Sequence, residues 1–274
     1  MEGKQRKTTK VPVGEIRKAL EFNSKVARGW GTRMREESWY RDASIESIGR
    51  TFLDCLPESY LHDPNTMGEA FKKYIENTLS KSKEKRNGLT AVEFGGPGSA
   101  LFAGFSKGFF GKTIGVCLKD LRQDTQKERE QKNGHLIIEG NILDVINYKV
   151  YGKVATQLAN GKTDLIISRM MGPLDQIEKN PAILDRVIRK WYGMLNTNGI
   201  MFIQIEFSDA GDEPFTYNHS VRRWADAIHS KCPEIEIQFD RPDMPYFVKR
   251  IRLHKNPGAP EELPSAAQMF KVGT

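Results

Sequence analysis

The sequence predicts an α/β fold in which a mostly parallel sheet ends in an antiparallel edge hairpin and follows a helical N-terminal extension. Three observations predict this fold. A buried strand around Val92 runs into an acid and a glycine-rich turn, apolar runs alternate with helical patterns at the pace of βα units, and the chain ends in two extended runs. With 274 residues, 38% of them hydrophobic, the chain can bury a full α/β core.

The N-terminal extension is expected to cover residues 1–87. Polar residues 81–88 predict a linker into the first strand, residues 88–254 are expected to hold the sheet, and residues 255–274 form a tail that contains proline and glycine. Apolar residues at helical spacing predict three helices in the extension, at residues 13–28, 45–56 and 67–79.

Seven strands are expected in the sheet. The first ends at Glu93 and Phe94, directly before the glycine turn. In the edge hairpin, Ile235, Ile237 and Phe239 alternate with polar residues, which is typical of an antiparallel strand with one solvated face. The other expected strands are residues 113–118, 136–139, 164–168, 199–206 and 246–253.

The turn Gly95-Gly96-Pro97-Gly98 favours a nucleotide cofactor site. Its glycines allow a tight reversal and have no Cβ atoms that would block a ligand, and the helix that starts at Ser99 is expected to present free N–H groups. The carboxyl end of a first strand is also where open α/β sheets bind ligands. Ordinary turns share this composition, so other motifs must decide.

Two other nucleotide motifs fit less well. The dinucleotide motif G-x-G-x-x-G requires a small third residue, and counting from Gly96 and Gly98 gives Leu101. A Walker loop requires Gly-Lys-Ser or Gly-Lys-Thr after the glycine turn. Gly111-Lys112-Thr113 instead stands at the start of an expected strand, without the upstream glycine spacing.

Five strand-helix units, an acid at the end of the first strand and an edge hairpin resemble the class I, Rossmann-like S-adenosylmethionine (SAM)-dependent methyltransferases over residues 88–254. The resemblance implies SAM as cofactor and transfer of its methyl group to an N or O nucleophile. It also implies that Arg169 and Met170, after the fourth strand, face the acceptor. The cofactor contacts that it implies are Glu93, Gly95, Gly96, Gly98, Asn141, Ile142 and Ser168.

The chain departs from the family pattern at the acid that usually ends strand two and binds the ribose hydroxyls. Cys117 or Leu118 stands there, and Asp120 is the nearest carboxylate. Asp120 is either the substitute or only the start of a charged helix over residues 120–132.

Two further departures concern the cofactor loops. Pro97 makes the glycine loop one residue shorter than the usual pattern. Asn141 stands where the family commonly has an aspartate that accepts the adenine amino group. The carboxamide oxygen of asparagine can accept the same hydrogen bond.

Methyl transfer from a sulfonium is an in-line displacement, so the protein mainly has to desolvate and align the acceptor. No metal is required. A hydroxyl or protonated amine needs a base, and the candidates are Glu206, at the end of the fifth strand, and His219. Glu206 could equally be a strand-end carboxylate bonded to a backbone amide.

The acceptor is expected to be a small organic molecule under a helical lid formed by the extension. Trp39 and Tyr40 would line its pocket or pack the lid on the sheet. RNA is the alternative acceptor, because residues 1–35 carry ten Lys or Arg against three acids, and Ser168-Arg169 with the following Pro173-Leu174 faintly resembles guanine-N7 methyltransferases of ribosomal RNA. A catalytically silent SAM-fold scaffold is the third possibility, since the strand-two acid is missing.

Composition favours a cytoplasmic protein. The chain has no apolar stretch near the ~20 residues that span a bilayer, and residues 1–10 have no signal-peptide core. Cys55, Cys117 and Cys232 are isolated, which argues against a disulfide framework and a zinc site. The oligomeric state does not follow from these patterns.

Overall fold

A computed structural model describes residues 42–61, 67–83, 88–117, 119–140, 142, 149–168, 181–204, 225–240 and 250–264. Seven strands form one sheet in this part of the chain. They are β1 (Leu89–Phe94), β2 (Phe110–Cys117), β3 (His135–Glu139), β4 (Thr163–Ser168), β5 (Leu195–Gln204), β6 (Ile235–Phe239) and β7 (Arg250–Lys255).

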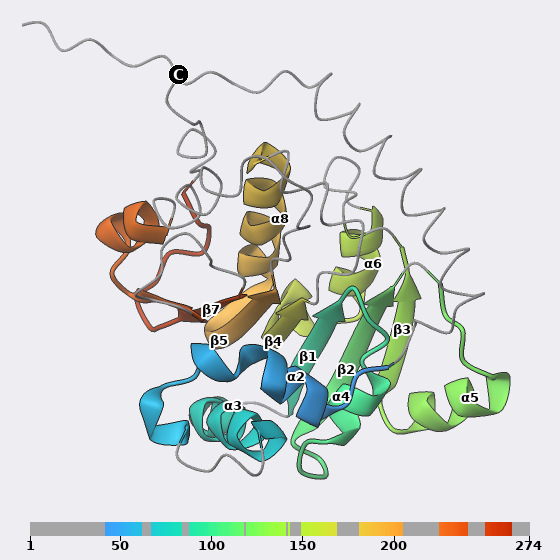
Figure 1. Ribbon diagram of the computed structural model, residues 1–274. Helices are drawn as coiled ribbons and strands as arrows, with labels where there is room; N and C mark the ends of the chain where they lie inside the picture. Colours follow the sequence, from blue (N-terminus) through green and yellow to red (C-terminus); the bar gives the residue numbers. More distant parts are fainter. Residues whose placement is uncertain are drawn as a thin grey trace, which may run out of the picture.

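The strand order is β3-β2-β1-β4-β5-β7-β6 (Figure 1). The strands from β3 to β5 are parallel, and β7 pairs antiparallel with both β5 and β6. This sheet confirms the predicted fold class, including the antiparallel edge pair. The order also places β2 and β3 on one side of β1 and β4 and β5 on the other, so the topology switches direction between β1 and β4.

Helices cover both faces of the sheet. Figure 1 shows α2, α3 and α4 together on one face and α8 and α6 on the other. Two 3₁₀ turns, η1 and η2, join α2 to α3, and η3 follows α6. The bounds are α2 (Ile45–Phe52), η1 (Leu53–Cys55), η2 (Glu58–Tyr60), α3 (Met67–Lys83), α4 (Ser99–Ala103), α5 (Asp124–Lys132), α6 (Lys149–Thr156), η3 (Ala159–Gly161) and α8 (Pro181–Met194).

Alternate residues of the central strands supply the two halves of the core. Val92 and Phe94 of β1 belong to the cluster that includes Trp191 of α8, and the rings of Phe94 and Trp191 stack with centroids 5.1 Å apart. Leu89 and Ala91 face the opposite cluster, with α2 and α3. Because both faces are covered, β1 and β4 are almost completely buried, which explains their continuous apolar runs.

The described part of the N-terminal extension packs directly on the sheet. Phe52 of α2 and Phe71 of α3 lie 5.2 and 5.0 Å from Phe202 of β5, measured between ring centroids. Helix α3 continues to Lys83, so the linker predicted from residue 81 is wrong at its start. Ser82 is buried, and no proline or glycine stops the helix there.

β5 begins at Leu195, four residues before the expected Gly199. The pairing register between β4 and β5 shifts next to this start, and Asn198 has a left-handed φ of 64°. β5 therefore includes residues 195–198, whose composition is typical of a turn, and its pairing with β4 is irregular there. Asn tolerates this conformation better than most residues, which is why a turn composition occurs inside a strand. Among the described helices, none is long and apolar enough to cross a membrane.

Candidate cofactor site

The glycine turn follows β1 directly. Gly95 and Gly98 have φ values of +94° and +73°, in the left-handed region that favours glycine. A Cβ atom on Gly98 would lie 2.8 Å from the ring of Phe102 and 3.3 Å from the carboxylate of Glu93. The turn therefore requires glycine at both positions, as its composition predicted.

The turn folds back over β2. The N–H of Gly95 donates to the carbonyl of Val116 at 2.8 Å, and Gly96 forms an isolated antiparallel bridge with the same residue. A Cβ atom on Gly115 would lie 1.8 Å from the carbonyl oxygen of Pro97. Gly115 therefore lets the turn approach the strand, a role that no sequence motif indicated.

His135, the first residue of β3, holds the middle of the turn. Its Nε2 lies 2.9 Å from the carbonyl oxygen of Pro97, and its Nδ1 lies 2.8 Å from the hydroxyl of Thr113. A carbonyl only accepts, so Nε2 carries the hydrogen and Nδ1 accepts from Thr113. Burial lowers the pKa of His135, which favours this neutral form near pH 7.

The start of α4 is held by two acids from distant segments. The hydroxyl of Ser99 donates to Glu130 of α5 at 2.6 Å, and the N–H of Ala100 donates to Asp42 at 2.6 Å. The sequence predicted free N–H groups at this helix start, and for Ala100 that prediction is wrong. The reason is tertiary, because Asp42 comes from the extension, 58 positions away.

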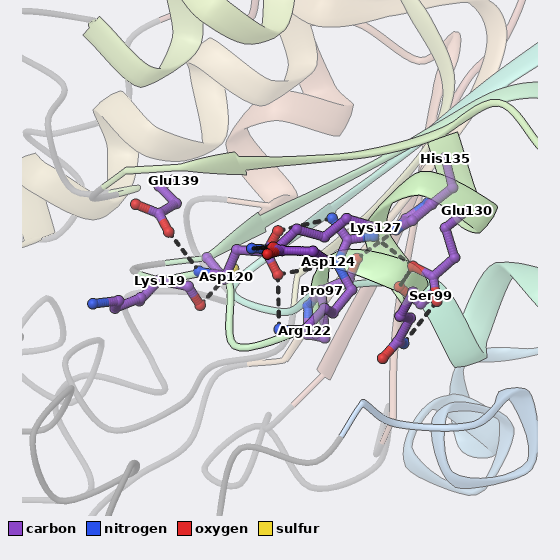
Figure 2. A network of polar contacts seen from close by, with 12 residues as sticks. Pro97, Ser99, Lys119, Asp120, Arg122, Asp124, Lys127, Glu130, His135 and Glu139 are labelled. Carbon is purple, nitrogen blue, oxygen red and sulfur yellow. Dashed lines mark hydrogen bonds and ion pairs between the residues drawn. The ribbon is translucent and has the colours of Figure 1, made fainter. Parts of the chain in front are cut away.

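Arg122 joins the two carboxylates next to the turn (Figure 2). Its Nε and Nη2 donate to the two oxygens of Asp120 at 3.0 and 2.9 Å, and its Nη1 donates to Glu130. Gln126 donates to the other oxygen of Glu130 at 2.7 Å. Ser99, Glu130, Arg122 and Asp120 thus form one chain of charge-assisted hydrogen bonds.

The charges of this chain stabilise one another. Burial by itself would raise the pKa values of Asp120 and Glu130, but hydrogen bonds outweigh it and hold both below their ordinary values: those to Asp120 come from Arg122, and those to Glu130 come from Ser99, Gln126 and Arg122. Burial would likewise lower the pKa of Arg122, and its bonds to the two carboxylates raise it instead. All three groups are therefore ionised near pH 7.

Asp120 lies before the charged helix and is not part of it. Helix α5 begins at Asp124, so the alternative that Asp120 starts the helix is wrong. Asp120 lies three residues after the end of β2, in a segment without regular secondary structure, and its N–H donates to Glu139 at the end of β3 at 2.8 Å. Both of its carboxylate oxygens already accept from Arg122, so a ribose would have to share them.

Other predicted site residues gather at the carboxyl ends of β1 and β4. Glu93 is fully buried in β1, and Ser168 ends β4 as the ladder partner of Phe94. The Ser168 hydroxyl is buried and has no hydrogen-bond partner among the described residues. Ile142 instead belongs to the apolar core, and its carbonyl accepts from the hydroxyl of Tyr151.

The remaining predicted site residues lie outside the described residues, and their predicted roles stay predictions. Asn141 was expected to bind the adenine, and the others to act in catalysis or to contact the acceptor. These are Trp39, Tyr40, Arg169, Met170, Glu206 and His219. Within the described ranges, no group of three or more His, Cys, Asp or Glu side chains is placed to hold a metal ion.

A cavity of about 530 Å³ lies near the amino ends of β4 and β5, between α6, α8 and the C-terminal segment. Lys162 and Arg189 line it. Lys162 donates to Gly193 and to Glu261, each at 2.7 Å, and Arg189 donates to the carbonyl of Leu263 at 3.0 Å. These contacts hold the C-terminal segment against α8 and the start of β4. The cavity is separate from the glycine turn.

No protein-family model and no curated protein sequence matches the chain. Solved structures are similar to it at low identity. The MycE methyltransferase from the mycinamycin biosynthetic pathway, in complex with Mg and SAH, is 12% identical with a TM-score of 0.40, and the match covers 79% of this chain and 50% of MycE. The chain thus spans about half the length of MycE.

Two further similar structures are a sugar N-methyltransferase and an rRNA methylase. The sugar N-methyltransferase KedS8 from Streptoalloteichus sp. ATCC 53650 is 16% identical with a TM-score of 0.30, and the match covers 51% of this chain and 50% of KedS8. An rRNA methylase from Streptococcus thermophilus is 13% identical with a TM-score of 0.38, covering 68% of this chain and 96% of that one. These similarities concern the fold alone.

Proposed function

We propose that the chain binds SAM against the glycine turn and transfers its methyl group to an acceptor at the same edge of the sheet. One observation carries the proposal. The topology switches between β1 and β4, and open α/β sheets bind ligands outside the carboxyl ends of strands at such a point. Glu93 and the glycine turn lie at the carboxyl end of β1, and Ser168 lies at the carboxyl end of β4 beside it.

The chemistry of these residues suits SAM. Gly95 carries no Cβ that would hinder the approach of a ligand to the backbone of the turn, and Gly98 lets the turn close on Phe102 and Glu93. The buried hydroxyl of Ser168 can donate or accept a hydrogen bond, and the carboxylate of Glu93 is an acceptor. Bound SAM supplies a methyl group activated by its sulfonium. The protein then has to hold the cofactor, align the acceptor and exclude water.

Calorimetry with S-adenosylhomocysteine, the demethylated product of SAM, tests the site. Gly95→Val should abolish binding, because a β-branched residue is strained at a left-handed backbone position and distorts the turn. Gly108→Val is the matched control. Gly108 is also left-handed, with a φ of +71°, but nothing lies within 4 Å of its Cβ position. Absence of binding to the unmodified protein at millimolar concentration refutes the proposal.

The ribose ligand can be tested in the same assay. If the carboxylate of Asp120 is shared between Arg122 and the ribose, Asp120→Ala should weaken binding of S-adenosylhomocysteine about tenfold or more. Ser99→Ala removes a hydrogen bond at the other end of the same chain of contacts and is the control. Equal effects of the two substitutions would mean that Asp120 acts only through the network.

We further propose a small organic acceptor enclosed by the extension. Asp42 bonds to Ala100 two residues after Gly98, which ties the extension to the cofactor turn. Tyr40 and Trp39 precede Asp42 by two and three residues, so the chain keeps them within about 11 Å of it, at ~3.6 Å per residue. Aromatic side chains at that distance suit an acceptor pocket beside the cofactor.

Labelled SAM separates the acceptor classes. With a small acceptor, Trp39→Ala should lower turnover and spare cofactor affinity, and deletion of residues 1–35 should change little. With RNA, that deletion should reduce RNA methylation and flatten its salt dependence, since ten Lys or Arg lie in this segment. Cofactor binding without methyl transfer to a small-molecule extract or to total RNA would favour the silent scaffold.

A further inference from the structure

The conformation of the cofactor turn depends on a residue outside it. Pro97 lies between the left-handed Gly95 and Gly98, and glycines give a free turn many conformations. One strong contact limits this freedom at the centre of the turn, the hydrogen bond from Nε2 of His135 to the carbonyl of Pro97. Without a donor here, the turn would retain freedom that a ligand must remove on binding.

The ladder of β2 and β3 orients the imidazole. Thr113 and His135 are direct ladder partners, and the side chain of each is buried. The Thr113 hydroxyl is 2.8 Å from Nδ1, so it donates there when Nε2 carries the hydrogen. The carbonyl of Pro97 selects this tautomer because it can only accept, and the Thr113 hydroxyl then supplies the donor for Nδ1. The opposite tautomer would place two acceptors against each other at 2.9 Å.

Simple core packing does not account for this arrangement. Gly115, on the same strand as Thr113, leaves the space in which Pro97 reaches the imidazole. Both ring nitrogens have partners, one in the turn and one on the neighbouring strand. Directly after the turn, the first residue of α4 is held as well, because the Ser99 hydroxyl donates to Glu130. The polar contacts of β3 and α5 thus converge on the turn.

We propose that His135, oriented by Thr113, is a positioning residue that holds the glycine turn in its cofactor-binding conformation. The inference rests on the proposed function, because it assigns the role toward SAM. His135 does not touch the cofactor in this account. It acts through the carbonyl of Pro97, and the hydrogen bond is present before any ligand binds.

Four variants test the role, with affinity for S-adenosylhomocysteine measured by calorimetry and folding followed by thermal melting. His135→Leu removes the donor and should weaken binding about tenfold, the effect of one lost hydrogen bond. His135→Gln keeps an N–H group at a similar reach and should restore affinity to within about threefold. Thr113→Val keeps the shape, leaves Nδ1 without a donor and should fall between them. His229→Leu, in the helical segment 225–231, is the matched control.

Imidazole ¹⁵N spectra supply a readout that packing alone would not change. The unmodified protein should show His135 with Nε2 protonated and Nδ1 free of hydrogen at pH 7.5, and Thr113→Val should keep this tautomer but shift the Nδ1 resonance, because its hydrogen bond is lost. Equal affinity of the Leu and Gln variants, or an Nδ1-protonated ring, overturns the inference. If His135→Leu does not fold, the Gln and Val variants decide by the same criteria. Failure of the unmodified protein to bind would instead refute the proposed function.

Discussion

Gly115→Ala tests the tightest contact of the glycine turn, that between β2 and Pro97. The new Cβ would lie 1.8 Å from the carbonyl oxygen of Pro97 and 2.3 Å from its carbonyl carbon. Both atoms belong to the backbone, so no side-chain rotation relieves the overlap. The turn must move by more than 1 Å to restore ordinary contact at roughly 3.4 Å, which separates Pro97 from His135.

The expected loss combines two effects. Overpacking at a site that cannot relax costs about 1–3 kcal/mol. Leaving the buried donor of His135 without its acceptor costs about 1–3 kcal/mol more. The free energy of unfolding should therefore fall by about 4 kcal/mol, the middle of the combined range. Binding of S-adenosylhomocysteine should be lost as well if the proposed function is right, because the displaced part is the proposed cofactor site.

Urea unfolding measures the first effect and calorimetry the second. Gly111→Ala is the matched control, since Gly111 belongs to the same strand and its Cβ would make only ordinary contacts, the nearest at 3.5 Å. That substitution should be neutral or stabilise by up to ~1 kcal/mol through a less flexible unfolded chain. Gly115→Ala with the same stability as Gly111→Ala would mean that Pro97 does not lie on β2.

Two further predictions concern charge. Arg122→Met should lower the free energy of unfolding at pH 7 by about 2–4 kcal/mol, because Asp120 and Glu130 lose the cation that they share. The pKa values of Asp120 and Glu130 are lowered in the folded protein, so their contribution to the free energy of unfolding is present above pH ~4 and is lost as the pH falls further. In urea titrations, the difference between the variant and the unmodified protein should therefore be large at pH 7 and small at pH 3. Burial lowers the pKa of His135 in the folded protein. Above pH ~6.5 the imidazole is neutral in both states, and its titration does not change the free energy of unfolding. Below that pH the unfolded chain binds the proton first, so the free energy of unfolding falls. Melting from pH 7.5 to 5 should show a smaller decline in His135→Gln, whereas an unchanged decline would assign the pH dependence to other groups.

The sequence by itself determined the fold class and the need for glycine in the turn after β1. Periodicity and composition are local properties, and they placed β2, β3 and β4 within three residues of their observed starts and β1 at its observed end. The edge pair was also predicted, because Ile235, Ile237 and Phe239 repeat with the two-residue period of a strand. The need for glycine at Gly95 and Gly98 followed from the same local reasoning, since tight reversals require left-handed backbone angles.

Only the tertiary structure decided which side chains meet at the turn. Arg122 donates to the carboxylate of Asp120, and Asp42 accepts from the N–H of Ala100. His135 bonds to the carbonyl of Pro97, 38 positions away in the sequence. Gly115 is a glycine because another segment lies on it, and nothing in its own strand indicates that contact. Such pairings depend on strand order and register, which bring together residues that share no periodic pattern. Hydrogen-bond partners at this site are therefore a property of the folded chain, whereas its elements follow from local sequence.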